Sequence, residues 1–148
     1  MARRRDAGLV SWLYVCRMTT LPPYAALLRL RIEDAGGRRL LAMPFHDDVV
    51  GRPGFLHGGA IAGLLELAAF DALRCALSEG GPGEAETRIK PVGVTVDYLR
   101  GGAASETYAH ARIKRLGKRI ANIEAAAWQE DENRPIATAR MNMLLARG

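Results

Sequence analysis

The sequence has few of the residues that build metal sites and covalent frameworks. Its 148 residues include two cysteines and three histidines, and neither set has the spacing of metal ligands. Cys16 and Cys75 each lie in an apolar pattern of helical period, which favours two reduced, buried thiols in a cytoplasmic protein. We therefore expect no bound metal and a cytoplasmic location.

Long apolar runs and basic aromatic surfaces are missing as well. The longest apolar stretch carries Glu66, Asp71 and Arg74 in its middle, so we expect no membrane-spanning helix and no membrane partner. The formal net charge is +5, but the basic residues are spread along the chain without an aromatic-rich platform. We therefore expect no nucleic-acid partner. A small ligand that carries phosphate groups is a sufficient reason for the positive excess, and so is an ordinary solvated surface.

The chain is long enough for one domain with a sizeable core and too short for two. We assign residues 21–148 to this domain and residues 1–20 to an N-terminal helical extension with Asp6 as a plausible N-cap. Asp6 interrupts the basic start, and no small-residue cleavage pattern follows, so we expect no signal peptide. Four residues share one face of the extension: Leu9, Trp12, Leu13 and Cys16.

Turn residues divide the domain into two strands, one long helix and four strands. The expected strands are 26–33, 38–45, 88–100, 106–116, 119–129 and 135–145. The helix follows a turn-rich lead-in that begins at Gly51, and it is apolar on most sides, so it needs to be enclosed. This order predicts the α+β class, with one curved antiparallel sheet wrapped around one buried helix.

The start of that helix has the composition of a site for a polarised oxygen. His57 is followed by Gly58 and Gly59, where the first amide N–H groups of the helix have no intrahelical partner. The positive end of the helix dipole favours negative charge there, and glycine lets a substrate approach the main chain. The stretch therefore predicts an oxyanion site.

An isolated carboxylate lies further along the same helix. Glu66 is flanked by leucines and an alanine, and a carboxylate in such surroundings suits general-base or nucleophilic work. Two other interpretations stay open, a side chain that reaches solvent at the helix edge and a buried ion pair with an arginine. Asp71 points in a different direction from Glu66, and we interpret it as structural.

Helix geometry separates the two candidate groups. At 1.5 Å per residue, eight positions put Gly58 and Glu66 about 12 Å apart, so one carbonyl cannot contact both within one chain. An antiparallel pair of these helices about a two-fold axis would bring Gly58 of one chain opposite Glu66 of another and would form two equal sites. Small residues on the Glu66 face would allow this approach, although close packing on a sheet explains them equally well.

Several motifs resemble the hotdog-fold acyl-CoA thioesterases, and the resemblance covers about residues 28–145. The most specific is Leu56-His57-Gly58-Gly59 with an acid nine positions after the histidine, at Glu66. The strand Val94–Arg100 and the basic hairpin Arg115–Arg119 are also similar to that family. The sequence is most similar to the PaaI-type group, which itself resembles the glutamate-using 4-hydroxybenzoyl-CoA thioesterases.

The resemblance implies an acyl-CoA thioesterase with no cofactor other than the CoA of its substrate. It implies that Gly58 N–H polarises the thioester carbonyl, that His57 shapes the loop, and that Glu66 of a neighbouring subunit attacks or activates water. With Gly59 of the helix start, these are the expected catalytic residues. It also implies a homodimer with a continuous sheet, often paired into a dimer of dimers. Basic residues near strand ends would hold the CoA phosphates: Arg100, Lys114, Arg115, Lys118 and Arg119. A solvated strand face explains each of them individually just as well.

Two positions depart from the family pattern. Gly51 stands where many relatives carry Asn or Gln, and Phe70 stands where the glutamate-using group carries a hydroxyl. They motivate a second hypothesis, a non-catalytic acyl-CoA-binding hotdog module. A third is a 3-hydroxyacyl-thioester dehydratase, suggested faintly by the Gly-Arg-Pro-Gly before the helix and opposed by the two glycines after His57.

Overall fold

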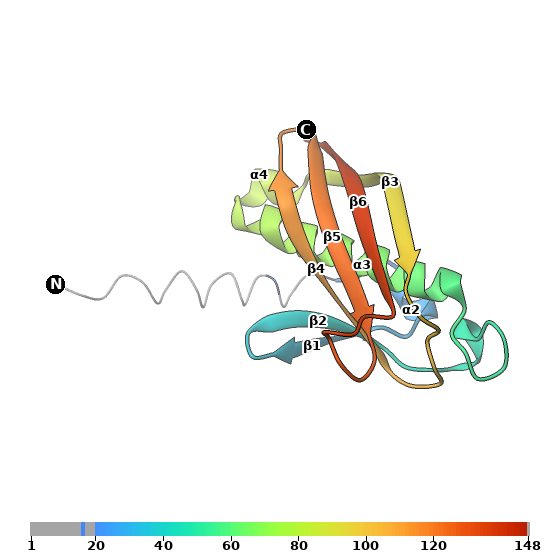
Figure 1. The fold of residues 1–148 in the computed structure, drawn as a ribbon. Coiled ribbons are helices and arrows are strands. Elements are labelled where there is room, and N and C mark those ends of the chain that lie inside the picture. Colours follow the sequence, from blue (N-terminus) through green and yellow to red (C-terminus); the bar gives the residue numbers. More distant parts are fainter. Residues whose placement is uncertain (1–15, 17–19, 148) are drawn as a thin grey trace.

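The computed structural model describes Cys16 and residues 20–147, which contain one six-stranded sheet and one long helix (Figure 1). The expected order of two strands, one long helix and four strands is confirmed. In chain order the elements are α2 (Tyr24–Leu27), β1 (Arg31–Ala35), β2 (Arg38–Met43), a 3-10 turn (Asp47–Val49), α3 (Gly58–Glu79), α4 (Pro82–Ala85), β3 (Arg88–Tyr98), β4 (Thr107–Leu116), β5 (Ile120–Trp128) and β6 (Ala137–Ala146).

Two short helices lie where the sequence pattern predicted the start of a strand and an irregular connection. Helix α2 occupies the beginning of the range expected to form the first strand, because Pro22 and Pro23 accept the first amide hydrogen bonds of a turn through their carbonyl oxygens. Helix α4 lies in the connection after α3. The expected N-terminal helix of residues 1–20 lies outside the described residues apart from Cys16 and Thr20.

The sheet is antiparallel throughout, in the order β1-β2-β4-β5-β6-β3. A two-residue turn joins β1 to β2, and both of its residues, Gly36 and Gly37, have positive φ angles of 64° and 85°. A side chain would strain this backbone, so glycine is required there. β3 lies at one edge of the sheet, where a proline such as Pro91 is tolerated, and its register shifts between Pro91 and Gly93.

Helix α3 packs against one face of the sheet, and the α+β hotdog arrangement expected from the sequence is confirmed (Figure 1). Leu64, Leu65 and Leu73 of α3 are fully buried against it. Strands β4, β5 and β6 present alternate small residues to the helix, which lets the helix lie close to the sheet. These buried residues are Ala109, Ala111, Ala125, Ala127, Ala137 and Ala139.

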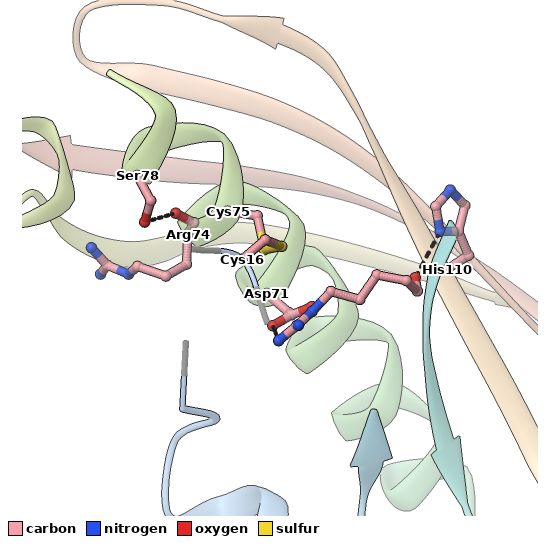
Figure 2. Close-up of a disulfide and its surroundings, with 7 residues drawn as sticks. Cys16, Asp71, Arg74, Cys75, Ser78 and His110 are labelled. Atoms are coloured by element: carbon pink, nitrogen blue, oxygen red, sulfur yellow. Dashed lines mark hydrogen bonds and ion pairs between the residues drawn. A yellow bond between two sulfur atoms is a disulfide. The ribbon is translucent and has the colours of Figure 1, made fainter. Parts of the chain in front are cut away.

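The prediction of two reduced thiols is wrong. Cys16 and Cys75 form a disulfide with Cα atoms 5.0 Å apart, and it ties the chain before α2 to the second half of α3 (Figure 2). The apolar pattern placed both sulfur atoms correctly in buried surroundings, since Cys16 is 6% exposed and Cys75 is 8% exposed. It carried no information that residues 59 positions apart would meet. The argument from reduced thiols to a cytoplasmic location no longer holds.

No helix among the described residues is long and apolar enough to cross a membrane.

Polar contacts connect the second half of α3 to the elements that follow it. Arg74 donates hydrogen bonds to the carbonyl oxygens of Ala85 and Thr87, at 2.7 and 2.8 Å, and burial lowers the pKa of its guanidinium. These bonds connect α3 to α4 and to the beginning of β3.

Candidate active site

His57 is the N-cap of α3. Its backbone is extended and its ring nitrogen Nδ1 accepts a 2.9 Å hydrogen bond from the N–H of Gly59. Nδ1 must therefore be unprotonated, which places the proton of a neutral ring on Nε2. The predicted loop-shaping role of His57 corresponds to this cap.

The hydrogen bonds of the first helical turn distinguish its four amide donors. Gly59 N–H is bound by the His57 ring, and the N–H groups of Ala60 and Ile61 lie 3.0 and 3.2 Å from the carbonyl oxygen of His57. Among the described residues, Gly58 N–H has no hydrogen-bond acceptor. A helix-start donor without a protein partner is a group that can bind an oxyanion or a polarised carbonyl.

Tyr98, at the end of β3, holds the same turn from the other side. Its hydroxyl donates a 2.8 Å hydrogen bond to the carbonyl oxygen of Gly58. The peptide group between Gly58 and Gly59 is therefore anchored at both ends, through its oxygen by Tyr98 and through its N–H by His57. A Cβ at Gly58 would lie 3.4 Å from the Tyr98 ring. Tyr98 was not predicted as a site residue, although it lies inside the strand motif that carried the resemblance.

The lead-in to α3 folds back on His57. Gly51 N–H donates to Phe55 O at 3.0 Å, and His57 N–H donates to Val49 O at 2.8 Å. A Cβ at Gly51 would lie 2.9 Å from the Cα atom of His57. Only glycine therefore fits at position 51 without a backbone shift, which explains why no amide side chain stands there.

Glu66 lies in the same continuous helix as Gly58, so the separation of about 12 Å applies within one chain. Its side chain is half-buried, and it makes no hydrogen bond or ion pair with the described residues. The buried ion pair with an arginine belongs instead to Asp71, which is 6% exposed and accepts bonds of 2.7 and 3.0 Å from Arg39 (Figure 2).

The predicted phosphate-binding residues lie at two ends of the sheet. Arg100 follows Tyr98 at the end near the start of α3, where it lines a hollow of about 200 Å³ with Gln129 and Arg134. The β4–β5 hairpin, which carries Lys114, Arg115, Lys118 and Arg119, lies at the opposite end of the sheet, about 30 Å away for a strand of this length. All five predicted side chains are exposed. Arg134 was not predicted.

One chain thus brings together His57, Gly58 and Gly59, with Tyr98 beside them, and leaves Glu66 and the hairpin apart. The polar groups at the start of α3 come from the edge strand β3, from the lead-in before the helix and from α3 itself. They form a donor for an oxygen atom, and Glu66 of the same chain lies about 12 Å along the helix from that donor.

Several solved structures share this fold. The BH2602 protein from Bacillus halodurans, solved with CoA, is 17% identical with a TM-score of 0.72 over 100% of this chain and 97% of that one. Thioesterase HI1161 from Haemophilus influenzae is 19% identical with a TM-score of 0.70, over 94% and 90% of the two chains. A phenylacetic acid degradation-related protein from Ralstonia eutropha is 19% identical with a TM-score of 0.69, over 90% and 98%.

At these identities the likeness establishes a common fold, and no curated protein matches the sequence significantly. The family is shown by the sequence itself. The model of the Thioesterase superfamily matches residues 53–136, which include the helix start, Glu66 and Tyr98. Since the match spans more than half of the 148 residues, the chain belongs to the Thioesterase superfamily.

Proposed function

We propose that the protein hydrolyses an acyl-CoA thioester at a site formed by Gly58 of one copy and Glu66 of a second copy. The observation that carries the proposal is the N–H of Gly58, which has no acceptor among the described residues while its three neighbours in the first turn are bound. A donor left free beside a fixed peptide is suited to the oxygen of a thioester carbonyl.

In the proposed reaction, the carbonyl oxygen accepts a hydrogen bond from Gly58 N–H, which stabilises the negative charge that develops on it. The carboxylate of Glu66 from the second copy either attacks the carbonyl carbon or takes a proton from an attacking water. The carbon–sulfur bond breaks, and CoA leaves as a thiolate that is then protonated. If water attacked, the acyl group leaves directly as a carboxylic acid; if Glu66 attacked, the acyl group forms a mixed anhydride with Glu66, and a water molecule then hydrolyses it to the carboxylic acid and the free carboxylate. His57 and Tyr98 keep the Gly58–Gly59 peptide in place.

The free edge of β3 supports a homodimer. This 11-residue strand pairs only with β6 among the described strands, and it exposes Val92, Val94 and Tyr98 at 54%, 43% and 54%. A long apolar edge is a template for another strand. Antiparallel pairing of two β3 strands about a two-fold axis would continue the sheet and would place the helix start of one copy at the hairpin end of the other.

This arrangement also accounts for the spread of basic residues. Arg100 and Arg134 of one copy and the β4–β5 hairpin of the other would lie on the same side of the dimer and could share the phosphates of one CoA. The fold relative solved with CoA supports a CoA ligand. A further pairing of dimers, implied by the family resemblance, remains part of the proposal.

The sharpest test removes the Gly58 N–H alone. Gly58 is the first helical residue, where proline is well tolerated, and His57 before it has the extended backbone that proline requires (φ −69°, ψ 134°). We expect Gly58→Pro to lower kcat for acyl-CoA hydrolysis by about 10²- to 10³-fold. Gly58→Ala is the matched control, because it adds a side chain and keeps the N–H, and we expect a much smaller loss.

A complementation experiment tests the shared site. Glu66→Gln should lower kcat by at least about 10²-fold. When Glu66→Gln and Gly58→Pro chains are unfolded and refolded together, each mixed dimer has one site with both groups intact. We expect the mixture to regain about a quarter of the wild-type activity, since half of the dimers are mixed and each has one of two sites. No recovery would exclude a site shared in this way.

Gly51 and Phe70 favour one alternative, a module that binds acyl-CoA without hydrolysing it. The backbone contact at Gly51 leaves no room for a water-orienting amide side chain. Tight binding of acyl-CoA with no release of thiol over a panel of acyl groups would establish this alternative. Thiol release that depends on Glu66 would exclude it.

A further inference from the structure

Tyr24 of α2 lies over Gly63, on the half-buried face of α3 that also carries Glu66. A Cβ at Gly63 would lie 2.8 Å from Cε1 of Tyr24 and 3.0 Å from its hydroxyl oxygen, and the three atoms nearest to that position all belong to Tyr24. Any larger residue at position 63 would force the ring to move. Tyr24 itself is 46% exposed, so its outer side is open to a ligand or to a second copy.

Gly63 and Glu66 are neighbours on that face. Residues three apart on a helix have Cβ atoms about 5–6 Å from each other, so the Tyr24 ring borders the space in front of the Glu66 carboxylate. Phe70, four residues further along, borders the same space from the other direction, and its ring lies 5.4 Å from the guanidinium carbon of Arg74. Along the helix, Glu66 thus lies between Gly63, which the Tyr24 ring covers, and Phe70.

Helix α2, which carries Tyr24, is itself anchored in the core. Ala25 within α2 and Leu28 directly after it are 5% and 2% exposed and belong to the core. The ring of His46 lies 3.2 Å from the carbonyl oxygen of Leu28 and connects the end of α2 to the loop after β2. A ring on a helix anchored in this way forms a stable boundary.

We propose that Tyr24 is a specificity-determining residue that limits the size of the acyl group. The inference rests on the proposed function. A thioester carbonyl bound at Gly58 of one copy faces Glu66 of the other, and the acyl group attached to it then lies against the Tyr24 ring next to that Glu66. The ring closes the space on the side of Gly63, so acyl groups that extend in this direction are excluded.

The test compares kcat/KM over straight-chain acyl-CoA substrates from two to sixteen carbons for the wild type and for Tyr24→Ala. We expect the optimum to move to longer chains, with a gain of about fourfold for each additional methylene that the opened space accommodates. Gly63→Ala should move the optimum in the same direction, because its methyl group displaces the ring. Leu27→Ala is the control: Leu27 lies on the same helix with 54% exposure, and its variant should keep the wild-type profile.

An unchanged chain-length profile in Tyr24→Ala would overturn the inference. So would a loss of the dimer in that variant, measured by light scattering, because Tyr24 would then be an interface residue. Non-hydrolysable thioether analogues of the same chain lengths separate the two proposals. If the wild type hydrolyses no substrate, the proposed function fails. The boundary at Tyr24 is then still supported if Tyr24→Ala moves the highest analogue affinity to longer chains. Analogue affinities that are unaffected, or too weak to measure, overturn it.

Discussion

Tyr98 and Gly58 are joined by a 2.8 Å hydrogen bond between the tyrosine hydroxyl and the glycine carbonyl oxygen. The bond connects the free edge strand of the sheet to the first residue of α3. Because the next residue, Gly59, is bound by the His57 ring, the peptide that follows the free N–H of Gly58 is held at both ends. Strand pairing at β3 and the orientation of the proposed oxyanion donor are therefore mechanically linked.

Removing the Tyr98 hydroxyl should weaken catalysis without unfolding the protein. Tyr98→Phe keeps the ring and deletes one hydrogen bond, which typically contributes about 0.5–1.5 kcal/mol, so we expect kcat/KM to fall by about 2- to 13-fold. The side chain is 54% exposed, and we expect the free energy of unfolding in urea to change little. A variant with full activity would show that Tyr98 does not position the Gly58 donor.

An amide side chain at position 51 should harm the protein even though many relatives carry one there. Gly51→Gln places a Cβ 2.9 Å from the backbone Cα atom of His57, and the loop must shift to admit it. We expect a loss of about 1–3 kcal/mol in the free energy of unfolding and a fall in kcat, because His57 caps the helix start. Gly54→Gln is unsuitable as a control because of its positive φ, so Arg52→Gln serves. Higher activity in Gly51→Gln would contradict the steric explanation.

The elements of the fold were predictable where local pattern determines them. The turn residues correctly divided the domain into two strands, one long helix and four strands, and the glycines after His57 correctly marked the start of α3. The contacts that refine the site were not predictable, because they join distant segments. Tyr98 and Gly58 are 40 positions apart and Asp71 and Arg39 are 32 apart, and periodicity carries no information about which polar side chains meet.

The same limit explains the error at the cysteines. Helical periodicity identifies a buried sulfur atom and does not identify its neighbour. Likewise, Glu66 and Asp71 are both isolated acids in one apolar helix, and the sequence alone left an ion pair with arginine open for Glu66. The arginine that forms the observed ion pair is Arg39 on β2, and its partner is Asp71 on α3.

Reduction of the Cys16–Cys75 disulfide should lower stability. The bond closes a loop between residues 59 positions apart, and the chain-entropy model gives about 4 kcal/mol for such a loop. We expect the urea midpoint to fall when the wild type is treated with a phosphine reductant. The double variant Cys16→Ser/Cys75→Ser is the control and should not respond to reductant. Equal midpoints for oxidised and reduced wild type would contradict a stabilising bond.

The ion pair of Arg38 and Glu132 should contribute a small, pH-dependent stability. Arg38 donates bonds of 2.6 and 3.1 Å to the carboxylate, which lowers the pKa of Glu132 below its usual 4.5. The contribution is therefore complete above the pKa of the unfolded chain and is lost as the pH falls through the lower pKa of the folded state. Both side chains are nearly half exposed, so we expect Glu132→Gln to cost about 0.2–1 kcal/mol at pH 7. The cost should disappear in strong acid, and a cost that is independent of pH would contradict the assignment.

The pair of Arg39 and Asp71 should behave differently, because both groups are largely buried. Their side chains are 16% and 7% exposed, and the guanidinium binds both carboxylate oxygens. Asp71→Leu removes the carboxylate that binds the Arg39 guanidinium and leaves that charge largely buried, so we expect a loss of about 3–5 kcal/mol in the free energy of unfolding. The double variant Arg39→Met/Asp71→Leu removes both charges and should recover most of that loss. A complete double-mutant cycle in urea measures the coupling, with Arg39→Met as the remaining corner. If Asp71→Leu alone is as stable as the double variant, Arg39 is compensated by another group and the pair does not explain the burial of Asp71.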